Sequence, residues 1–215
     1  MLETVRGRRK ALTVYARSVD VADELRDYFA SQNVAVHYAH CGLEEPEHVV
    51  LAERSEYEAA VPLDAMKTLL NDDAPTPVGE DAPYRPVLAG LDDTTFSSYD
   101  RRQTLYATRE VEDRAWRVSV GTLHAGFQTL STFLEERETY ERLARSDLDL
   151  HVHGAPDAPE PDIEGVTVHP SDHPDITDTW FAVYDGGPDE QQKSALVAEE
   201  HDAGRFRGVL TYDGA

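Results

Sequence analysis

The order of apolar and polar residues predicts a strand, a helix and a second strand near the N-terminus. Residues 10–15 alternate as in a half-buried strand, and residues 34–38 repeat this character. Ser18 is the expected N-cap of the intervening helix, and Asn33 its expected end. One apolar helical face is formed by Val19, Ala22, Leu25 and Phe29. Together these elements predict a small unit of βαβ type.

Two further apolar runs, 48–52 and 57–61, flank a polar turn and predict a hairpin, with a small helix over 63–70. The stretch 71–83 contains three prolines and four acidic residues without apolar periodicity, which is typical of a linker. We therefore expect three parts: an N-terminal α/β unit over 1–70, a linker over 71–83 and a second domain over 84–215.

The second domain is expected to open with a short helix over 84–91 and a β-prone run over 94–99. Asp100 can cap the next helix, with Gln103 at the capping-box position. A long helix is then predicted over 122–145, because apolar residues recur there at helical spacing. Its apolar face would consist of Leu123, Phe127, Leu130, Leu134, Tyr140 and Leu143.

The remainder of the chain changes to strand character. Strands are predicted over 148–153, 166–169, 179–184, 194–199 and 206–212. The fold class expected is therefore α/β to α+β. A mixed or mainly antiparallel sheet would carry two long helices on one face, preceded by the small βαβ-type unit.

Charge changes the expected setting of the protein. The chain has 42 acidic and 20 basic residues and a formal net charge of −22. Self-repulsion at this level destabilises a compact chain unless salt screens it, and the acidic residues are spread along the whole sequence. We expect a halophilic, cytoplasmic protein, the alternative being an acidic mesophilic one.

Cysteine usage, hydropathy and the absence of known catalytic motifs exclude several classes of protein. The single cysteine, Cys41, excludes an internal disulfide framework and a multi-cysteine zinc site. No apolar run approaches the length of a membrane span, and no signal-peptide pattern follows the basic N-terminus. Neither a phosphate-binding glycine loop nor a nucleophile elbow occurs. We expect no enzyme activity, no cofactor and no membrane partner.

Two clusters invite a chemical interpretation. Aromatic and hydrogen-bonding residues gather over 110–128, where Trp116, His124, Phe127 and Gln128 could line a pocket or simply form core. The nine histidines include His151 and His153, two apart on a predicted strand, with His169 and His173 beyond. Exposed strand and loop histidines remain the favoured interpretation, and a metal-dependent enzyme is only a third possibility.

The second domain also resembles a known family. The segments that carry the resemblance are, in order, ATREVEDRAW, GTLHAGFQTLSTF, ETYERLA, DLHVHGAPDAP, GVTVHP, DTWFAVYDG and FRGVLTYD. Over residues 84–214 they resemble the DICT sensory domain, named for diguanylate cyclases and two-component systems, as it occurs in haloarchaeal proteins. The resemblance implies a regulatory module without catalytic residues. It places recurrent family positions at Glu112, Phe127, Gln128 and Tyr140.

These observations lead to two functional hypotheses. The first is a non-enzymatic sensor or adaptor that binds a small molecule or partner protein through Glu112, Trp116, His124, Phe127, Gln128 and Tyr140. Because no cyclase, kinase or receiver segment follows, its output is expected to pass through a separate signalling partner, such as a histidine kinase or a transcription regulator. Signal binding should then shift the docking of the predicted 122–145 helix or of the N-terminal unit.

The alternative is a transcription-associated regulator that contacts DNA directly. It would use the basic cluster Arg6 to Lys10 and the region Arg101 to Arg117, which holds five arginines. We disfavour nucleic acid as a partner because Glu110, Glu112 and Asp113 interrupt the second basic region.

Overall fold

A computed structural model describes residues 10–53, 56–72, 74–91 and 94–212. These residues form two compact units. Unit 1 comprises residues 1–75 and 81–97, and unit 2 comprises residues 76–80 and 98–215. The stretch predicted as a linker therefore contributes residues 76–80 to unit 2. The division into a unit over 1–70, a linker over 71–83 and a domain over 84–215 stays a prediction.

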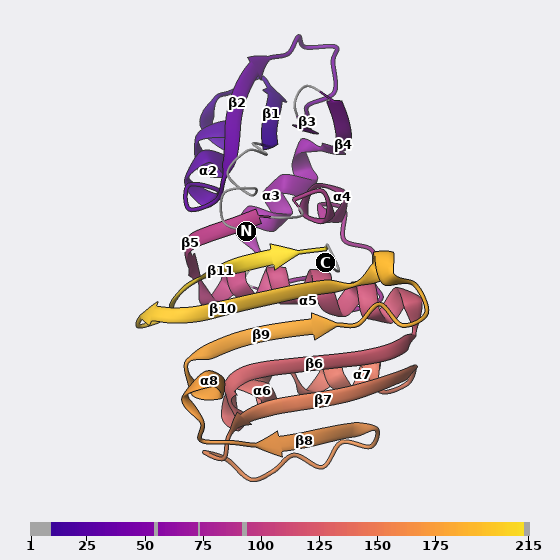
Figure 1. Ribbon diagram of the computed structural model, residues 1–215. Coiled ribbons are helices and arrows are strands. Elements are labelled where there is room, and N and C mark those ends of the chain that lie inside the picture. The colour runs from indigo at the N-terminus through magenta and orange to yellow at the C-terminus, as the bar shows by residue number, and fades with distance from the viewer. Residues whose placement is uncertain (1–9, 54–55, 73, 92–93, 213–215) are drawn as a thin grey trace. The chain divides into compact units, whose positions relative to one another are not determined.

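Unit 1 is a four-stranded sheet of order β2-β1-β3-β4 (Figure 1). Strands β1 (Lys10–Ala16) and β2 (Val34–His40) are parallel and joined by helix α2 (Asp20–Tyr28). Strand β3 (His48–Glu53) pairs antiparallel with β1 and with β4 (Glu56–Pro62). The unit also contains α3 (Leu63–Asn71) and α4 (Arg85–Ala89). The predicted βαβ arrangement, hairpin and small helix are thus confirmed.

The boundaries of α2 differ from the prediction. The N-cap is Val19 rather than Ser18, although Ser18 Oγ still accepts a hydrogen bond from the backbone N–H of Asp20 at 3.3 Å. The helix ends at Tyr28 instead of continuing toward Asn33. Val19 is 42% exposed, so the apolar face begins at Ala22 rather than at Val19.

The larger sheet is mixed and has seven strands in the order β5-β11-β10-β9-β6-β7-β8; strands β6 to β11 belong to unit 2, and the edge strand β5 spans the boundary between the two units. Strands β6, β7 and β8 are mutually parallel, whereas β6, β9, β10 and β11 pair antiparallel. The strand bounds are β5 Thr94–Asp100, β6 Val120–Thr129, β7 Asp147–Ala155, β8 Val166–Pro170, β9 Thr179–Tyr184, β10 Ser194–Asp202 and β11 Arg205–Thr211. The predicted α+β class and five of these strands are confirmed.

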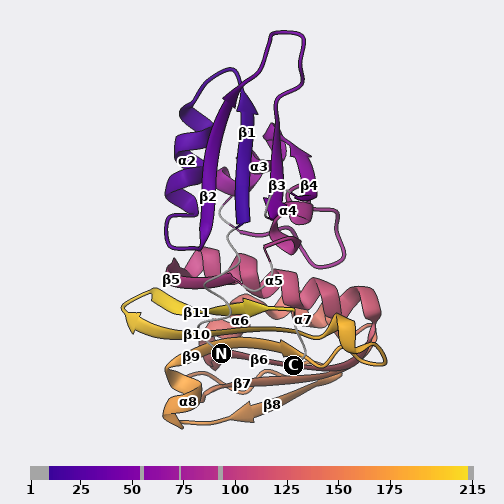
Figure 2. The ribbon, with the colours of Figure 1, turned by 45° about the horizontal axis from the view of Figure 1, so that its top comes forward.

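Helices α5 (Arg101–Val118), α6 (Leu130–Glu135) and α7 (Arg137–Leu143) lie behind this sheet in Figure 1. Helix α5 starts with the predicted capping box: the Gln103 N–H donates to Asp100 Oδ1 at 2.8 Å, and the Asp100 N–H donates to Gln103 Oε1. The short helix α8 (Pro174–Thr177) and the 3₁₀ turn η1 (Glu190–Gln192) lie in connections. Figure 2 shows α5 running along the sheet.

The predicted long helix over 122–145 is wrong. Its first part is strand β6, and only residues 130–135 and 137–143 are helical, as α6 and α7. In β6 the buried Leu123, Ala125 and Phe127 alternate with outward residues, which is strand periodicity. Gly126 lies inside the predicted helix, where glycine costs about 1 kcal/mol relative to alanine. The prediction was misled because Leu123, Phe127 and Leu130 are four and three residues apart, which is also the spacing of an apolar helical face.

Candidate functional site

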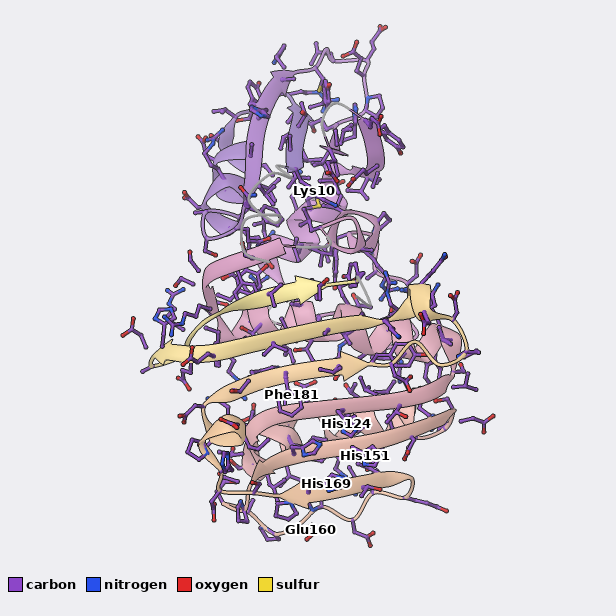
Figure 3. All side chains as sticks on the ribbon, viewed as in Figure 1. Lys10, His124, His151, Glu160, His169 and Phe181 are labelled. Carbon is purple, nitrogen blue, oxygen red and sulfur yellow. The ribbon has the colours of Figure 1, made fainter. Side chains whose placement is uncertain are left out.

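Strand β6 divides the predicted site residues between the two faces of the large sheet. Phe127 points toward the helices and is fully buried. His124 points to the opposite face, where its ring stacks on that of His151 with 4.5 Å between ring centroids (Figure 3). The two residues therefore do not share one site, although a helix would have placed them one turn apart.

Three of the six residues come together on the helix side. Glu112 on α5, Phe127 on β6 and Tyr140 on α7 are each 0% exposed. The Phe127 ring meets the Tyr140 ring edge-on at 5.8 Å and the Trp180 ring edge-on at 5.2 Å between centroids. Phe133 completes this aromatic group at 5.0 Å from Tyr140. Phe127 and Tyr140 are thus integral to the core of unit 2.

A buried guanidinium connects α5 to the helices that follow β6. Arg109 is 6% exposed, and its Nη1 donates to Glu112 Oε2 at 2.8 Å and to Thr139 Oγ1 at 2.8 Å. Its Nη2 donates to Glu136 Oε2, also at 2.8 Å. We call Arg109, Glu112, Glu136, Thr139 and Tyr140 the buried polar cluster. Charge-assisted bonds of this kind are strong and directional, so Arg109 fixes how α6 and α7 meet α5.

Burial dominates the protonation of this cluster. Desolvation raises the pKa of Glu112 to about 7, although Arg109 acts in the opposite direction. Desolvation and the nearby Glu112 charge raise the pKa of Tyr140 well above its usual value. For Arg109, burial lowers the pKa, but Glu112 and Glu136 outweigh it and the pKa is raised. The cluster therefore holds a cation and a carboxyl group that titrates near neutrality.

The cluster also has unused hydrogen-bonding capacity. Tyr140 lies close enough to Glu112 for each to shift the pKa of the other. This mutual effect includes a hydrogen bond between the two side chains. Arg109 Nε is buried and has no hydrogen-bond partner among the described residues. A buried polar atom without a partner is rare in folded proteins and costs stability.

The other predicted residues have separate surroundings. Half-buried Trp116 covers Gly79, where a Cβ atom would lie 2.6 Å from Trp116 Nε1. Gln128 lies within a register irregularity of β6, between Gly126 and Thr129, and has a φ of +66°. Its Nε2 donates to the Thr177 carbonyl at 3.1 Å and to Glu200 Oε2 at 2.6 Å. Trp116 and Gln128 therefore act as local contacts away from the buried polar cluster.

A surface pocket of about 500 Å³ lies beside α7, lined in part by Arg137, Glu141, Arg145 and Ile163. None of the six predicted residues lines it.

The sheet face that carries His124 gathers three more histidines. Register places His124 opposite His151 between β6 and β7, and His153 opposite His169 between β7 and β8. We call these four residues the histidine quartet (Figure 3). The sequence had associated His173 with this group, but His173 instead caps α8, its Nδ1 accepting from the Asp175 N–H at 3.3 Å. His124 was predicted as a site residue but was not grouped with these histidines, because its segment was predicted to be helical.

The arginines of the alternative DNA surface have partners within the domain. Arg101 pairs with Glu135, Arg109 with Glu112 and Glu136, and Arg117 with Asp113. Arg102 and Arg114 lie over the rings of Tyr106 and Tyr212. Of the N-terminal basic cluster, Arg6 to Arg9 lie outside the described residues. Lys10 is buried in unit 1, where it donates to the Gly90 carbonyl and pairs with Glu58 at 3.4 Å.

A protein-family comparison decides what kind of domain this is. The model of the DICT family, described as a sensory domain in diguanylate cyclases and two-component systems, matches residues 86–201, more than half of the chain. The chain belongs to the DICT family. This confirms the resemblance seen in the sequence, and the DICT segment contains all six predicted site residues as well as the histidine quartet.

Searches among curated proteins and among solved structures gave no match. Within the described part of the chain, no helix is long and apolar enough to cross a membrane. A sensory role in signal transduction follows from membership of the DICT family.

Proposed function

We propose that this chain is a non-enzymatic, cytoplasmic sensory module whose DICT domain binds a small molecule or a partner protein and passes a conformational change to a separate output protein. A histidine kinase or a transcription regulator is the kind of partner expected. Sensory DICT membership supports the general role. The observation that carries the finer proposal is the buried polar cluster, which joins α5 to Glu136 and α7 and leaves Arg109 Nε without a partner among the described residues.

The buried polar cluster stabilises its arrangement of helices only in part. A buried ionic network with an unpaired member contributes less to stability than a fully hydrogen-bonded one, so a ligand can shift its arrangement at a lower cost in free energy. A ligand whose polar groups pair with Glu112 and Tyr140 would bind one arrangement of α6 and α7 better than another. By linkage, that differential affinity would shift the population of the two arrangements. Because Glu112 and Tyr140 are fully buried, binding requires α6 and α7 to loosen from the sheet.

The proposal is tested by native and denaturing mass spectrometry of the full chain, purified in molar KCl after exposure to a small-molecule extract. We expect one compound released on denaturation in stoichiometric amount. Its binding should increase hydrogen-exchange protection over residues 130–143. Glu112→Gln should weaken retention, whereas His173→Ala, which alters a cap outside the cluster, should retain the compound.

An empty protein whose exchange over residues 130–143 also stays unchanged when a candidate signalling protein is added would overturn the proposal. A compound retained equally by the Glu112→Gln variant would place the binding site elsewhere.

A further inference from the structure

The histidine quartet gathers four imidazoles from adjacent parallel strands, and each is partly exposed. Figure 3 shows three of them, His124, His151 and His169, on the sheet face turned to the viewer. His124 stacks on His151 at 4.5 Å, His151 on His169 at 5.1 Å and His153 on His169 at 4.7 Å between centroids. Three stacking contacts therefore link the four rings.

Nitrogen atoms meet along the diagonals of the quartet. His151 Nδ1 lies 2.9 Å from His169 Nε2, and His124 Nδ1 lies 3.2 Å from His153 Nε2, so each pair is joined by a hydrogen bond between ring nitrogens. Two nitrogens bound to one metal ion at about 2.0–2.1 Å, at angles of roughly 90–110°, are separated by about 2.9–3.4 Å. Each diagonal therefore already has the spacing of two neighbouring ligands on one ion.

The carboxylate of Asp149 orients the His151 ring in one of these pairs. Asp149 Oδ2 lies 3.2 Å from His151 Nε2, on the opposite side of the ring from the nitrogen that faces His169. With its proton on Nε2, His151 presents a lone pair at Nδ1. Histidine ligands of metal ions commonly donate their second ring N–H to a carboxylate in this manner. Nε2 of His169 becomes available to a metal ion when the ring proton moves to Nδ1, which breaks the hydrogen bond to His151.

The charge of the chain favours a cation at this face, because a net charge of −22 raises the local concentration of cations.

We propose that the histidine quartet is a binding site for a divalent transition-metal ion, with His151 Nδ1 and His169 Nε2 as its first two ligands. Imidazole donors suit Zn²⁺, Ni²⁺ and Cu²⁺ rather than Mg²⁺ or Ca²⁺. Within the described ranges, no three histidine, cysteine or acidic side chains already surround a common point. The site is therefore a two-histidine site, completed by water or by a donor atom from another molecule.

The first test uses Zn²⁺ and the unmodified chain. ZnCl₂ is titrated into metal-free protein in molar potassium nitrate, where salt suppresses binding to surface carboxylates. Long-range ¹H–¹⁵N spectra of the histidines identify which ring nitrogens ligate. We expect the His151 Nδ1 and His169 Nε2 signals to move to the values of metal-bound nitrogen, and an equal concentration of Mg²⁺ to leave them unchanged.

Variants provide the second test. His151→Phe and His169→Phe keep an aromatic ring in each stack, and each should weaken Zn²⁺ binding at least tenfold. Asp149→Asn should weaken it about 10- to 100-fold, as for other outer-shell partners. His173→Phe is the matched control, because His173 lies outside the quartet, and it should bind as the unmodified chain does. Circular dichroism checks that each variant is folded.

The proposal is overturned if Zn²⁺ moves no nitrogen signal of the quartet. It is also overturned if His151→Phe and His169→Phe bind Zn²⁺ as tightly as His173→Phe. Ligation confined to His124 and His153 would overturn the assignment of the first two ligands.

Discussion

Gly126 lies directly opposite Phe181 across the antiparallel pair β6 and β9, and the Phe181 ring lies over it. A Cβ atom on residue 126 would stand 2.1 Å from Phe181 Cε1, far inside van der Waals contact. The same ring contacts His153 at 5.6 Å between centroids. Because Gly126 has no side chain, the Phe181 ring has room to lie over it and to contact His153 of the histidine quartet.

Gly126→Ala should consequently destabilise the protein. The added methyl group displaces the Phe181 ring, and overpacking of this kind typically costs about 1–3 kcal/mol. Urea denaturation followed by circular dichroism measures the change. In the double variant Gly126→Ala with Phe181→Ala, the clash is gone, so the cost of the alanine at 126 should largely disappear. An equal cost in both backgrounds would contradict this account of Gly126.

Strand β6, which contains Gly126, shows why part of the fold was predictable from the sequence and part was not. Five strands of unit 2 and the capping box at Asp100 follow local rules, and the structure confirms them. Strand β6 does not follow these local rules. Its buried Leu123 and Phe127 are spaced as on a helical face together with Leu130, which is the first residue of helix α6. Only pairing with β7 and β9 decides its conformation, and pairing is a long-range interaction that single-sequence periodicity does not contain.

The error in β6 propagated to the candidate site. A helix over 122–145 would have placed His124 and Phe127 close together, whereas the strand separates them. It also concealed that His124 is in register with His151. Conversely, Glu112 and Tyr140 were singled out by family resemblance alone, and their proximity depends on tertiary packing of α5 and α7. Arg109, which connects them to Glu136, carried no sequence signal beyond being one of many charged residues.

Removal of that connection should be costly. Arg109→Met leaves Glu112 and Glu136 without their shared buried cation, and breaking a buried ion pair from one side typically costs about 3–5 kcal/mol. Arg101→Met is the matched control, since its pair with Glu135 is about half exposed and such pairs contribute at most about 1 kcal/mol. Equal midpoints of thermal unfolding for the two variants would show that the cluster does not stabilise the domain.

A second buried hydrogen bond allows a cleaner substitution. Trp180 Nε1 donates to Thr108 Oγ1 at 2.9 Å, and both residues are buried. Thr108→Val preserves shape but removes the acceptor, which leaves a buried N–H unpaired at a cost of about 1–3 kcal/mol. Thr108→Ser keeps the hydroxyl and should lose less stability in the same denaturant titration. A larger loss for serine than for valine would mean that packing, and not the hydrogen bond, matters at this position.

Glu112 should make stability depend on pH in an unusual direction. Its folded pKa of about 7 exceeds its ordinary value of 4.5, so between these values the folded state binds more protons than the unfolded state. Its contribution to stability is therefore fully present below about pH 4.5 and is lost as pH rises through 7. Glu112→Gln resembles the protonated form and lacks this loss.

Comparing the Glu112→Gln variant with the unmodified chain separates the pH dependence due to Glu112 from that of the many other acidic groups. From pH 5 to pH 8, the stability of Glu112→Gln relative to the unmodified chain should rise by on the order of 1–3 kcal/mol. Chemical denaturation at several pH values in molar KCl measures this difference. A relative stability that is constant over the range would show that Glu112 ionises in the folded protein as it does in the unfolded chain.

His153 should produce the opposite pH effect. Burial and the neighbouring histidines lower its pKa from 6.5 to about 4 in the folded protein. The unfolded state therefore binds more protons below about pH 6.5, and the stability contributed by the neutral ring is lost as pH falls toward 4. His153→Phe keeps a ring against His169 and Phe181, so it should resist acid better than the unmodified chain. Histidine NMR titration gives the direct measurement: a His153 midpoint near 6.5 would contradict the lowered pKa of His153.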